Sequence, residues 1–236
     1  GIYTKRRFLL IVAVSVLSFC AVVNSSWNAT PDSALYLALG ESLAAGTGYV
    51  FNGEPHTLVP PGFPALLAIV AWLFGPHFLV YRLFMACVGL ITAWVGYMFV
   101  RRLCGRDTAL IVGGLFAVNH TLLYNCTFVL SDVPFALFTL IALHAVLSAG
   151  RTERFFFAWA VLSGLAVGLL PLMRINGLGV PPAAAFFLFC SSHRLFWQKR
   201  LLLVGVFLAI ALLPFAAWQW WKATFPVSHV EGGYFR

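Results

Sequence analysis

The sequence predicts an all-α fold, a polytopic bundle of helices that cross a membrane. Its 236 residues are 61% hydrophobic and only 9% charged, with a mean hydropathy of +0.92. This composition leaves too little polar surface to cover a soluble globule. Several apolar runs approach the roughly 20 residues that a helix needs to cross the hydrocarbon core, and the charges gather in short segments between these runs. The chain is therefore expected to be an integral membrane protein.

The distribution of charges predicts the topology. Eleven of the fifteen Lys and Arg residues fall in four clusters, around Lys5, Arg101, Arg151 and Lys199. The positive-inside rule places these clusters on the inner side of the membrane. The net charge of +8 is then a topology signal, and without a basic stripe interleaved with aromatic residues it does not indicate nucleic-acid binding. The segments on the other side, where we look for chemistry, hold five of the seven acids: Asp32, Glu41, Glu54, Asp132 and Glu231.

Phe8–Val23 is the first predicted span. It follows three basic residues and so has the form of a signal peptide, but no A-x-A cleavage site follows it, which favours a retained anchor. Residues 24–77 then form a long outer loop, in which we predict two helices along the membrane surface, Asp32–Ala45 and Phe63–Phe74. The second is too short and too close to prolines to be a span, and counting it as one would move two basic clusters to the outer side.

Six further apolar runs predict the remaining spans. The total is about seven transmembrane helices with an inward N-terminus, in a single module over residues 1–236. The chain ends within an outward segment, so we expect a C-terminal part to be absent. The six runs are Phe78–Val100, Thr108–Tyr124, Val133–Leu147, Phe155–Leu172, Pro181–Cys190 and Leu201–Trp221.

Two outward acids stand where a helix is expected to begin. Asp32 follows Thr30-Pro31, a typical N-cap and first helical residue, and Asp132 follows Ser131. Each acid therefore has a structural explanation, as a capping group or as a partner of the helix dipole. The helix after Asp32 carries leucines one turn apart and is expected to lie on the membrane, which places this carboxylate at the mouth of the bundle. Both acids are candidate catalytic residues.

Two arginines are candidate phosphate ligands. Arg82 lies several residues inside a predicted span and Arg174 at the outer end of another. A single arginine in such a place often only extends its guanidinium to the interface. The planar guanidinium also matches a phosphate, so a lipid with a phosphate headgroup is a natural partner for the two. Glu54 and His56, in a loop rich in Gly and Pro, are weaker candidates because they are equally explained as solvated loop residues.

Several short motifs resemble one known family when they are taken in order. They are Asp32…Tyr36…Gly46-Thr47-Gly48-Tyr49, then Pro60-Pro61-Gly62-Phe63-Pro64, then Tyr81-Arg82-Leu83, then Arg101-Arg102-Leu103-Cys104-Gly105-Arg106, then Ser131-Asp132-Val133-Pro134. Their order and spacing, from Asp32 to about Phe189, resemble the dolichyl-phosphate-mannose-protein mannosyltransferase-like family of GT-C glycosyltransferases.

The resemblance implies a GT-C module of about seven spans whose first outer loop carries surface helices and a catalytic acid. Members of the family transfer a sugar from a polyprenyl-phosphate carrier to a protein, lipid or glycan on the extracytoplasmic face. Asp32 matches the acid of that loop, Asp132 lies where many members have an acid, and Arg174 where many have Lys or Arg near the carrier phosphate. Asp32-Ser33 replaces the paired Asp-Glu of the protein mannosyltransferases, which weakens the case for a protein acceptor.

These inferences predict a membrane glycosyltransferase that moves a hexosyl or pentosyl group from a polyprenyl-phosphate donor to an acceptor hydroxyl. Asp32 and Asp132 are the catalytic candidates, and Arg174, Arg82, Tyr36, Glu54 and His56 are the candidates for binding substrate or lipid phosphate. A transporter or flippase of a lipid-linked anion, or a noncatalytic subunit, stays open as an alternative, although the chain shows no inverted repeat and its acids lie at the membrane rim.

Cofactors and cellular location are predicted from fewer features of the sequence. The five cysteines show no CxxC or Cys/His metal spacing and are interpreted as small core residues. Mg²⁺ or Mn²⁺ would take its ligands from Asp32 and Asp132. The absence of a retention signal favours a bacterial plasma membrane, with the active face outward, over the endoplasmic reticulum.

Overall fold

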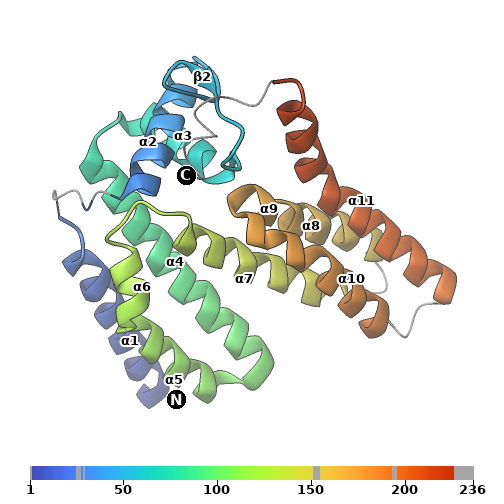
Figure 1. Ribbon diagram of the computed structural model, residues 1–236. Coiled ribbons are helices and arrows are strands. Elements are labelled where there is room, and N and C mark those ends of the chain that lie inside the picture. The colour runs from blue at the N-terminus through green and yellow to red at the C-terminus, as the bar shows by residue number, and fades with distance from the viewer. Residues whose placement is uncertain (1, 25–27, 29, 151–154, 193–195, 226–236) are drawn as a thin grey trace. The chain divides into compact units, whose positions relative to one another are not determined.

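The protein is an almost entirely helical chain (Figure 1). The computed structural model describes residues 2–24, 28, 30–150, 155–192 and 196–225. It divides into two compact units, Gly1–Gly48 with Pro64–Leu140 and Tyr49–Phe63 with Ile141–Arg236. The helices are α1 (Ile2–Ala21), α2 (Pro31–Ala44), α3 (Gly62–Phe74), α4 (Phe78–Cys104), α5 (Arg106–Ala117), α6 (His120–Asn125), α7 (Asp132–Ala149), α8 (Phe156–Gly168), α9 (Leu170–Met173), η1 (Ile175–Gly179), α10 (Val180–Ser191) and α11 (Trp197–Lys222).

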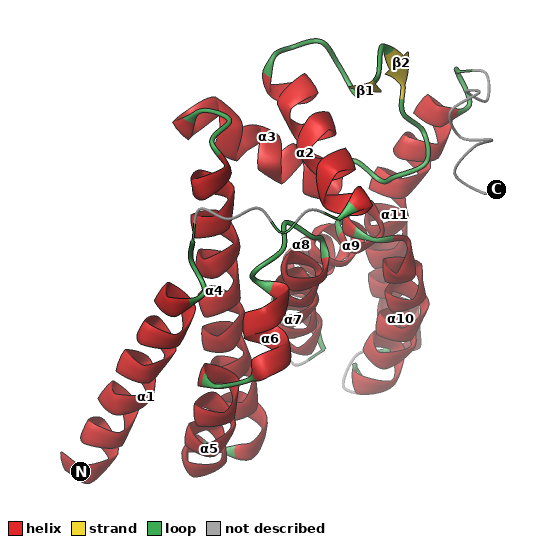
Figure 2. Cartoon of the chain, turned by 60° about the vertical axis from the view of Figure 1, so that its left-hand side comes forward, coloured by secondary structure: helices red, strands yellow, loops and turns green. Residues whose placement is uncertain are grey.

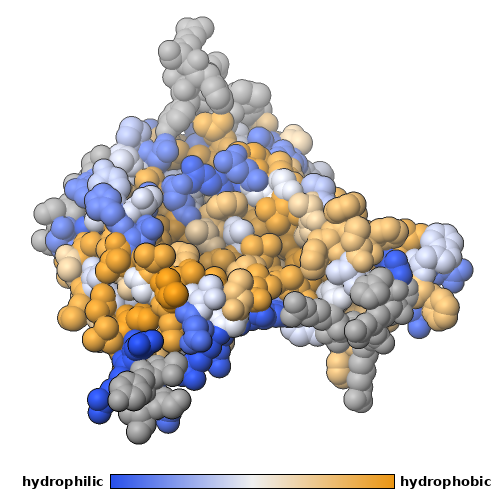
Figure 3. Space-filling model, turned by 90° about the horizontal axis from the view of Figure 1, so that it is seen from below, coloured by the Kyte–Doolittle hydropathy of each residue, from blue (hydrophilic) through white to orange (hydrophobic). Residues whose placement is uncertain are grey.

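The all-α fold class is confirmed, and four of the described helices are long and apolar enough to cross a membrane. The full count of seven spans stays a prediction. Figure 3 shows a surface on which orange hydrophobic residues predominate and blue hydrophilic residues gather in separate groups. Such a surface suits a protein whose solvent is largely lipid. The four segments are Phe78–Cys104, Asp132–Ala149, Phe156–Met173 and Trp197–Lys222.

The expected span Thr108–Tyr124 is not one continuous helix. It divides into α5 and α6 at Val118 and Asn119. The side-chain oxygen of Asn119 accepts a hydrogen bond from the backbone N–H of Leu122 at 2.8 Å and so starts a new helix. Hydropathy alone predicts one continuous helix here, because a single Asn changes the mean hydropathy of an apolar segment little. The same Asn is nevertheless a good N-cap.

A short antiparallel hairpin in the outer loop, β1 (Val50–Phe51) and β2 (Glu54–Pro55), was not predicted (Figure 2). Its turn is Asn52-Gly53, with φ angles of 52° and 84°. An Asn-Gly pair is the strongest short sequence signal for a tight hairpin turn, because both residues tolerate positive φ. The signal was therefore present in the sequence, although strands of two residues are too short to show alternation.

In the first unit α1 and α5 pack against α4. Tyr97, Ala109 and Leu110 form a buried cluster, against which Phe8 and Ile11 of α1 pack. Gly89 marks a close approach, since a Cβ there would collide with Cys126 Sγ and with the ring of Phe19. A glycine in the middle of a long helix thus lets α1 and the residues after α6 approach the α4 backbone.

In the second unit α8 packs along α11, and α10 also contacts α11. The hairpin belongs to this unit and covers one end of α11, where Tyr49 lies edge-on to Trp218 with their ring centroids 5.7 Å apart. Trp218 is buried and Trp220 is 77% exposed. Of the tryptophans near the end of α11, Trp218 is therefore a packing residue, whereas the exposure of Trp220 suits the membrane interface.

Candidate active site

Asp32 lies in the first turn of α2 and is exposed. The predicted cap is confirmed, because Thr30 Oγ1 accepts a hydrogen bond from the Ser33 backbone N–H at 3.1 Å. Ser33 Oγ in turn accepts one from the Thr30 backbone N–H at 3.0 Å, which completes a capping box with Ser in the place of the usual Glu. Pro31 has no N–H to leave unsatisfied at this position. The Asp32 carboxylate thus lies at the positive end of the α2 dipole, where the capping box fixes the start of the helix.

The buried side chains of α2 include Leu37 as well as Leu35 and Leu39. Residues two apart project about 200° from one another around a helix, so α2 is enclosed on more than one side. Gly40 is one reason, since a Cβ there would lie 2.8 Å from Cβ of Leu67 in α3. α2 is therefore embedded in protein to a greater extent than its leucine stripe predicted.

Tyr36 connects α2 with the residue that precedes α7 within the first unit. Its hydroxyl lies 3.3 Å from Ser131 Oγ, and Ser131 directly precedes Asp132. Asp32 is four residues before Tyr36 on α2, and Asp132 opens α7. The contact therefore links the second turn of α2 to the residue that precedes α7, and each helix has one candidate carboxylate in its first turn. Ser131 is buried, with 1% of its surface exposed.

Arg82 is buried, with 1% of its surface exposed, at the start of α4. Its Nη2 donates to the carbonyl oxygen of Val22 at 3.0 Å and to Oδ1 of Asn24 at 3.1 Å. Nε and Nη1 are also buried and have no hydrogen-bond partner among the described residues. The side chain thus holds the end of α1 and the start of the linker that leads to Asp32.

Tyr81, the neighbour of Arg82, also contacts the segment that carries Asp32. Its hydroxyl donates to Oε1 of Glu41 on α2 at 3.4 Å. Two successive residues of α4 therefore hold both sides of that segment, the linker before α2 and the later turns of α2. Glu41 was expected only as an outward acid, and no local pattern connects it with Tyr81, because forty residues separate the two.

Cys126 lies close to Arg82 and is 1% exposed. Burial raises the pKa of the Cys126 thiol to about 12, although the nearby Arg82 cation acts in the opposite direction. The thiol therefore stays protonated at neutral pH and supplies no counter-charge to the guanidinium.

Arg174 lies in the second unit, between α9 and η1. It is half-buried, and its backbone is extended. Its backbone N–H donates to Leu170 O at 2.9 Å, and its carbonyl accepts from the Gly177 N–H at 2.8 Å. Gly62 of the Pro-Pro-Gly motif lies against the same turn, since a Cβ there would be 2.9 Å from Met173 N and closer still to the carbonyl of Leu172. The motif and the arginine, 112 residues apart, are thus parts of one local structure.

Glu54 and His56 belong to the hairpin region of the second unit. Glu54 is exposed and His56 is buried. Nε2 of His56 accepts a hydrogen bond from the Val59 backbone N–H at 3.2 Å, and its ring packs against Tyr49 and Phe51. These contacts hold the His56 ring in the loop, and its role in binding substrate stays a prediction.

The seven candidate residues are divided between the two units. Asp32, Tyr36, Arg82 and Asp132 lie in the first, and Arg174, Glu54 and His56 in the second. Within the described part of the chain, no three His, Cys, Asp or Glu side chains gather as metal ligands would. Asp32 and Asp132 as ligands of a divalent ion therefore stay a prediction.

Comparisons with known proteins identify the family of the chain. The family model described as dolichyl-phosphate-mannose-protein mannosyltransferase matches residues 58–221. An uncharacterized protein from Aquifex aeolicus (strain VF5) is 25% identical over 223 residues, which are 92% of this chain and 43% of that protein. The chain thus spans less than half the length of this curated relative.

Solved structures share the fold. ArnT from Cupriavidus metallidurans in the apo state matches 95% of this chain and 43% of its own, with a TM-score of 0.73 and 19% identity. The structure of ArnT bound to undecaprenyl phosphate matches 92% of this chain and 41% of its own, with a TM-score of 0.68 and 19% identity. The S. cerevisiae protein O-mannosyltransferase Pmt1-Pmt2 complex, bound to the sugar donor, matches 90% and 33%, with a TM-score of 0.65 and 20% identity.

Proposed function

Because the chain belongs to the dolichyl-phosphate-mannose-protein mannosyltransferase family, we propose that it forms the membrane module of a glycosyltransferase. The enzyme moves a sugar from a polyprenyl-phosphate carrier to an acceptor hydroxyl on the extracytoplasmic face of a bacterial plasma membrane. The structures of ArnT with undecaprenyl phosphate and of Pmt1-Pmt2 with its sugar donor support a lipid-linked donor. The proposal leaves the sugar open between a hexose and a pentose.

One observation carries the proposal: the contact between Tyr36 and Ser131. It links α2 to the residue before α7, each of these helices has a candidate carboxylate in its first turn, and the Asp32 carboxylate is exposed. A general base must be accessible to its substrate and held in place, and the capping box together with the Tyr36 contact meets the second requirement.

In the proposed reaction Asp32 accepts the proton of the acceptor hydroxyl as its oxygen bonds to the anomeric carbon. The bond from that carbon to the carrier phosphate breaks, and the phosphate leaves with the electron pair. Arg174 stabilises the negative charge that grows on the phosphate. Asp132 helps to orient the acceptor. Of the two arginines, Arg174 is the better suited to the phosphate, because Arg82 is buried and donates to Val22 and Asn24.

Tyr36 supports this chemistry by positioning α2, and Glu54, which is exposed beside the hairpin, is a candidate for contact with the donor sugar. Mg²⁺ or Mn²⁺ held by Asp32 and Asp132 would add charge stabilisation at the phosphate. Transfer measured before and after EDTA treatment, followed by addition of each ion, tests this role.

The first test compares Asp32→Asn with Asp107→Asn in proteoliposomes. Asp107 lies in the first turn of α5 and has no part in the proposed site. Released polyprenyl phosphate is measured against a panel of polyprenyl-phosphate hexoses and pentoses. Loss of a general base costs about 10²- to 10⁴-fold, so we expect Asp32→Asn to fall by that factor and Asp107→Asn to keep its activity.

The carrier itself is tested by native mass spectrometry with undecaprenyl phosphate. We expect Arg174→Ala to weaken binding and Asp32→Asn to leave it intact. Full transfer by Asp32→Asn would disprove the assignment of the base. Passage of the intact donor across the vesicle, without release of the carrier, would instead favour the flippase alternative.

A further inference from the structure

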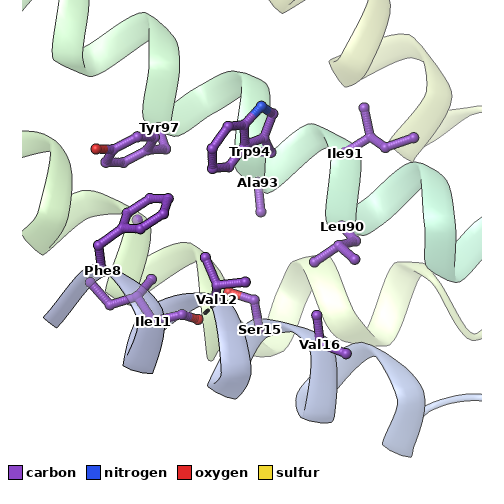
Figure 4. Close-up of a pocket in the computed structure, with 11 residues that line it drawn as sticks. Phe8, Ile11, Val12, Ser15, Val16, Leu90, Ile91, Ala93, Trp94 and Tyr97 are labelled. Carbon is purple, nitrogen blue, oxygen red and sulfur yellow. Dashed lines mark hydrogen bonds between the residues drawn. The ribbon is translucent and has the colours of Figure 1, made fainter. Parts of the chain in front are cut away.

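A half-open groove in the first unit has no role in the proposed reaction. α1 contributes Phe8, Val12 and Val16, α4 contributes Leu90 and Trp94, and α5 contributes Gly113. Figure 4 shows the aromatic residues Phe8, Trp94 and Tyr97 gathered at one end and the aliphatic Val16 and Leu90 at the other. The cavity volume is about 290 Å³.

The groove is lined mainly by apolar side chains. Of its two hydroxyl groups, that of Ser15 donates to Ile11 O at 2.8 Å within the same helix, and that of Tyr97 lies at the aromatic end. Ile91 and Trp94 are each 47% exposed, so the groove opens on the surface of α4 that a lipid would meet. The aliphatic part of this cavity offers water no hydrogen bonds, whereas a hydrocarbon chain fits its lining.

The groove extends along most of the thickness of one membrane leaflet. From Phe8 to Val16 α1 rises about 12 Å, and from Tyr97 back to Leu90 α4 rises about 10 Å. One leaflet of the hydrocarbon core is about 15 Å thick. The bonds from Arg82 to Val22 and Asn24 at the far end of α1 and the contact of Phe8 with Trp94, whose centroids are 5.8 Å apart, show that the two helices run antiparallel along this length.

The aromatic end of the groove is strongly basic. Arg7 directly precedes Phe8, and it lines a neighbouring cavity with Asp107, Leu110 and Ile111 of α5. α4 ends here and α5 begins after a single residue, Gly105. Against one acid, Asp107, this end carries six cations: Lys5, Arg6, Arg7, Arg101, Arg102 and Arg106.

We propose that the groove binds one acyl chain of an anionic phospholipid, whose headgroup phosphate contacts the basic end of α1, α4 and α5. The apolar walls set the depth of the chain, and the cations select a negative headgroup over a zwitterionic one. The site is separate from the proposed transfer of sugar and does not depend on it.

The test uses native mass spectrometry of the protein from nanodiscs that contain equal amounts of dioleoyl phosphatidylglycerol and dioleoyl phosphatidylcholine. We expect wild-type protein to retain phosphatidylglycerol preferentially, as a one-to-one complex. Each basic contact contributes about fivefold to the affinity for anionic lipid. Arg6→Gln/Arg7→Gln should therefore lower retention of phosphatidylglycerol by more than tenfold and leave phosphatidylcholine unchanged.

The matched control is Lys199→Gln/Arg200→Gln, which removes the same charge at the start of α11. We expect it to keep the preference. Val12→Trp fills the groove and should lower retention of both lipids. Ile91→Trp is a second filling variant on the open side, where bulk is tolerated, and thermal melting shows whether each variant is folded. Asp32→Asn should bind phosphatidylglycerol like the wild type even if it has lost transfer.

Equal retention of the two lipids by the wild type would overturn the proposal. So would an equal loss in the Lys199→Gln/Arg200→Gln control, or full retention in both folded filling variants. Displacement of the bound lipid by undecaprenyl phosphate, with Arg6 and Arg7 not required, would assign the groove to the tail of the carrier instead.

Discussion

Arg82 fixes the chain ahead of Asp32 through two acceptors, Val22 O and Asn24 Oδ1. A buried guanidinium needs such partners because an unpaired buried charge is costly. Asn24 is exposed, so water can replace part of its contribution. The contribution of the Asn24 contact can nevertheless be tested, since the Asn24 amide can be replaced by a carboxylate of the same shape.

We expect Asn24→Asp to raise the melting temperature at neutral pH and Asn24→Ala to lower it. A hydrogen bond to a charged group contributes about 1.5–3 kcal/mol. The introduced carboxylate lies beside a cation, so its pKa in the folded state should fall below the ordinary value of about 3.9. The gain is therefore present above that pH and is lost as the pH falls through the folded-state pKa.

The control for this pair is Asn28→Asp, in the same linker and also exposed. It should change the melting temperature little. An equal gain in Asn28→Asp would show that the effect comes from general electrostatics and not from the contact with Arg82.

Gly62 shows a different constraint, the close approach of two backbones. A Cβ at this position would lie 2.5 Å from Leu172 O, next to the turn that carries Arg174. Gly62→Ala should therefore lower the free energy of unfolding by about 1–3 kcal/mol and weaken carrier binding. Gly205→Ala, in α11 with open space around it, should be neutral or slightly stabilising, as chemical denaturation would show. An unchanged Gly62→Ala would mean that the motif does not support the arginine turn.

At the scale of elements, the pairing of α8 with α11 rests on small residues. Gly164 and Gly168 form a G-x-x-x-G pattern, and their added Cβ atoms would lie 2.9 Å from Phe207 O and 2.8 Å from Ala211 O. Lipid tails are as apolar as the surfaces of the helices, so the hydrophobic effect does not drive helices together in a membrane. Their association depends on such close packing. The pattern is visible in the sequence, but its partner helix is not.

Gly168→Leu should separate α8 from α11 and lower the melting temperature in detergent by several degrees, since the new side chain meets backbone and Pro214. Ala158→Leu adds a similar volume to the exposed face of α8 and should be tolerated. A comparable loss in both variants would indicate that any added bulk on α8 is harmful, and would remove the special role of the glycine pair.

At the scale of the whole molecule, the charge pattern predicts one orientation in the membrane. In a background without the native cysteines, we expect Arg101→Cys and Lys199→Cys to react with a membrane-impermeant maleimide only from the cytoplasmic side. Glu54→Cys should react only from the other side, because positive charges near the ends of spans are retained in the cytoplasm. Labelling of whole cells against inverted vesicles measures both. Reaction of Arg101→Cys and Glu54→Cys from one side would refute this topology and the outward active face with it.

Much of the fold was predictable because hydropathy is a local property. The apolar run Phe78–Val100 became α4, Val133–Leu147 became α7 and Leu201–Trp221 became α11, each within a few residues. The Thr30 cap and the start of α2 were equally local, since the hydrogen bonds involved join residues three apart. The break between α5 and α6 was missed because one side-chain cap at Asn119 outweighed the average hydropathy of its segment.

The sequence by itself determined the helical membrane class, the family and the residue types available for chemistry, because composition, run length and short motifs carry that information. Only the tertiary structure decided what those residues do. It buried Arg82 against Val22 and Asn24, and it joined Tyr36 to Ser131 across 95 positions. The physical reason is that a hydrogen bond forms between groups that packing brings within about 3 Å, and no local pattern reports which distant groups those are.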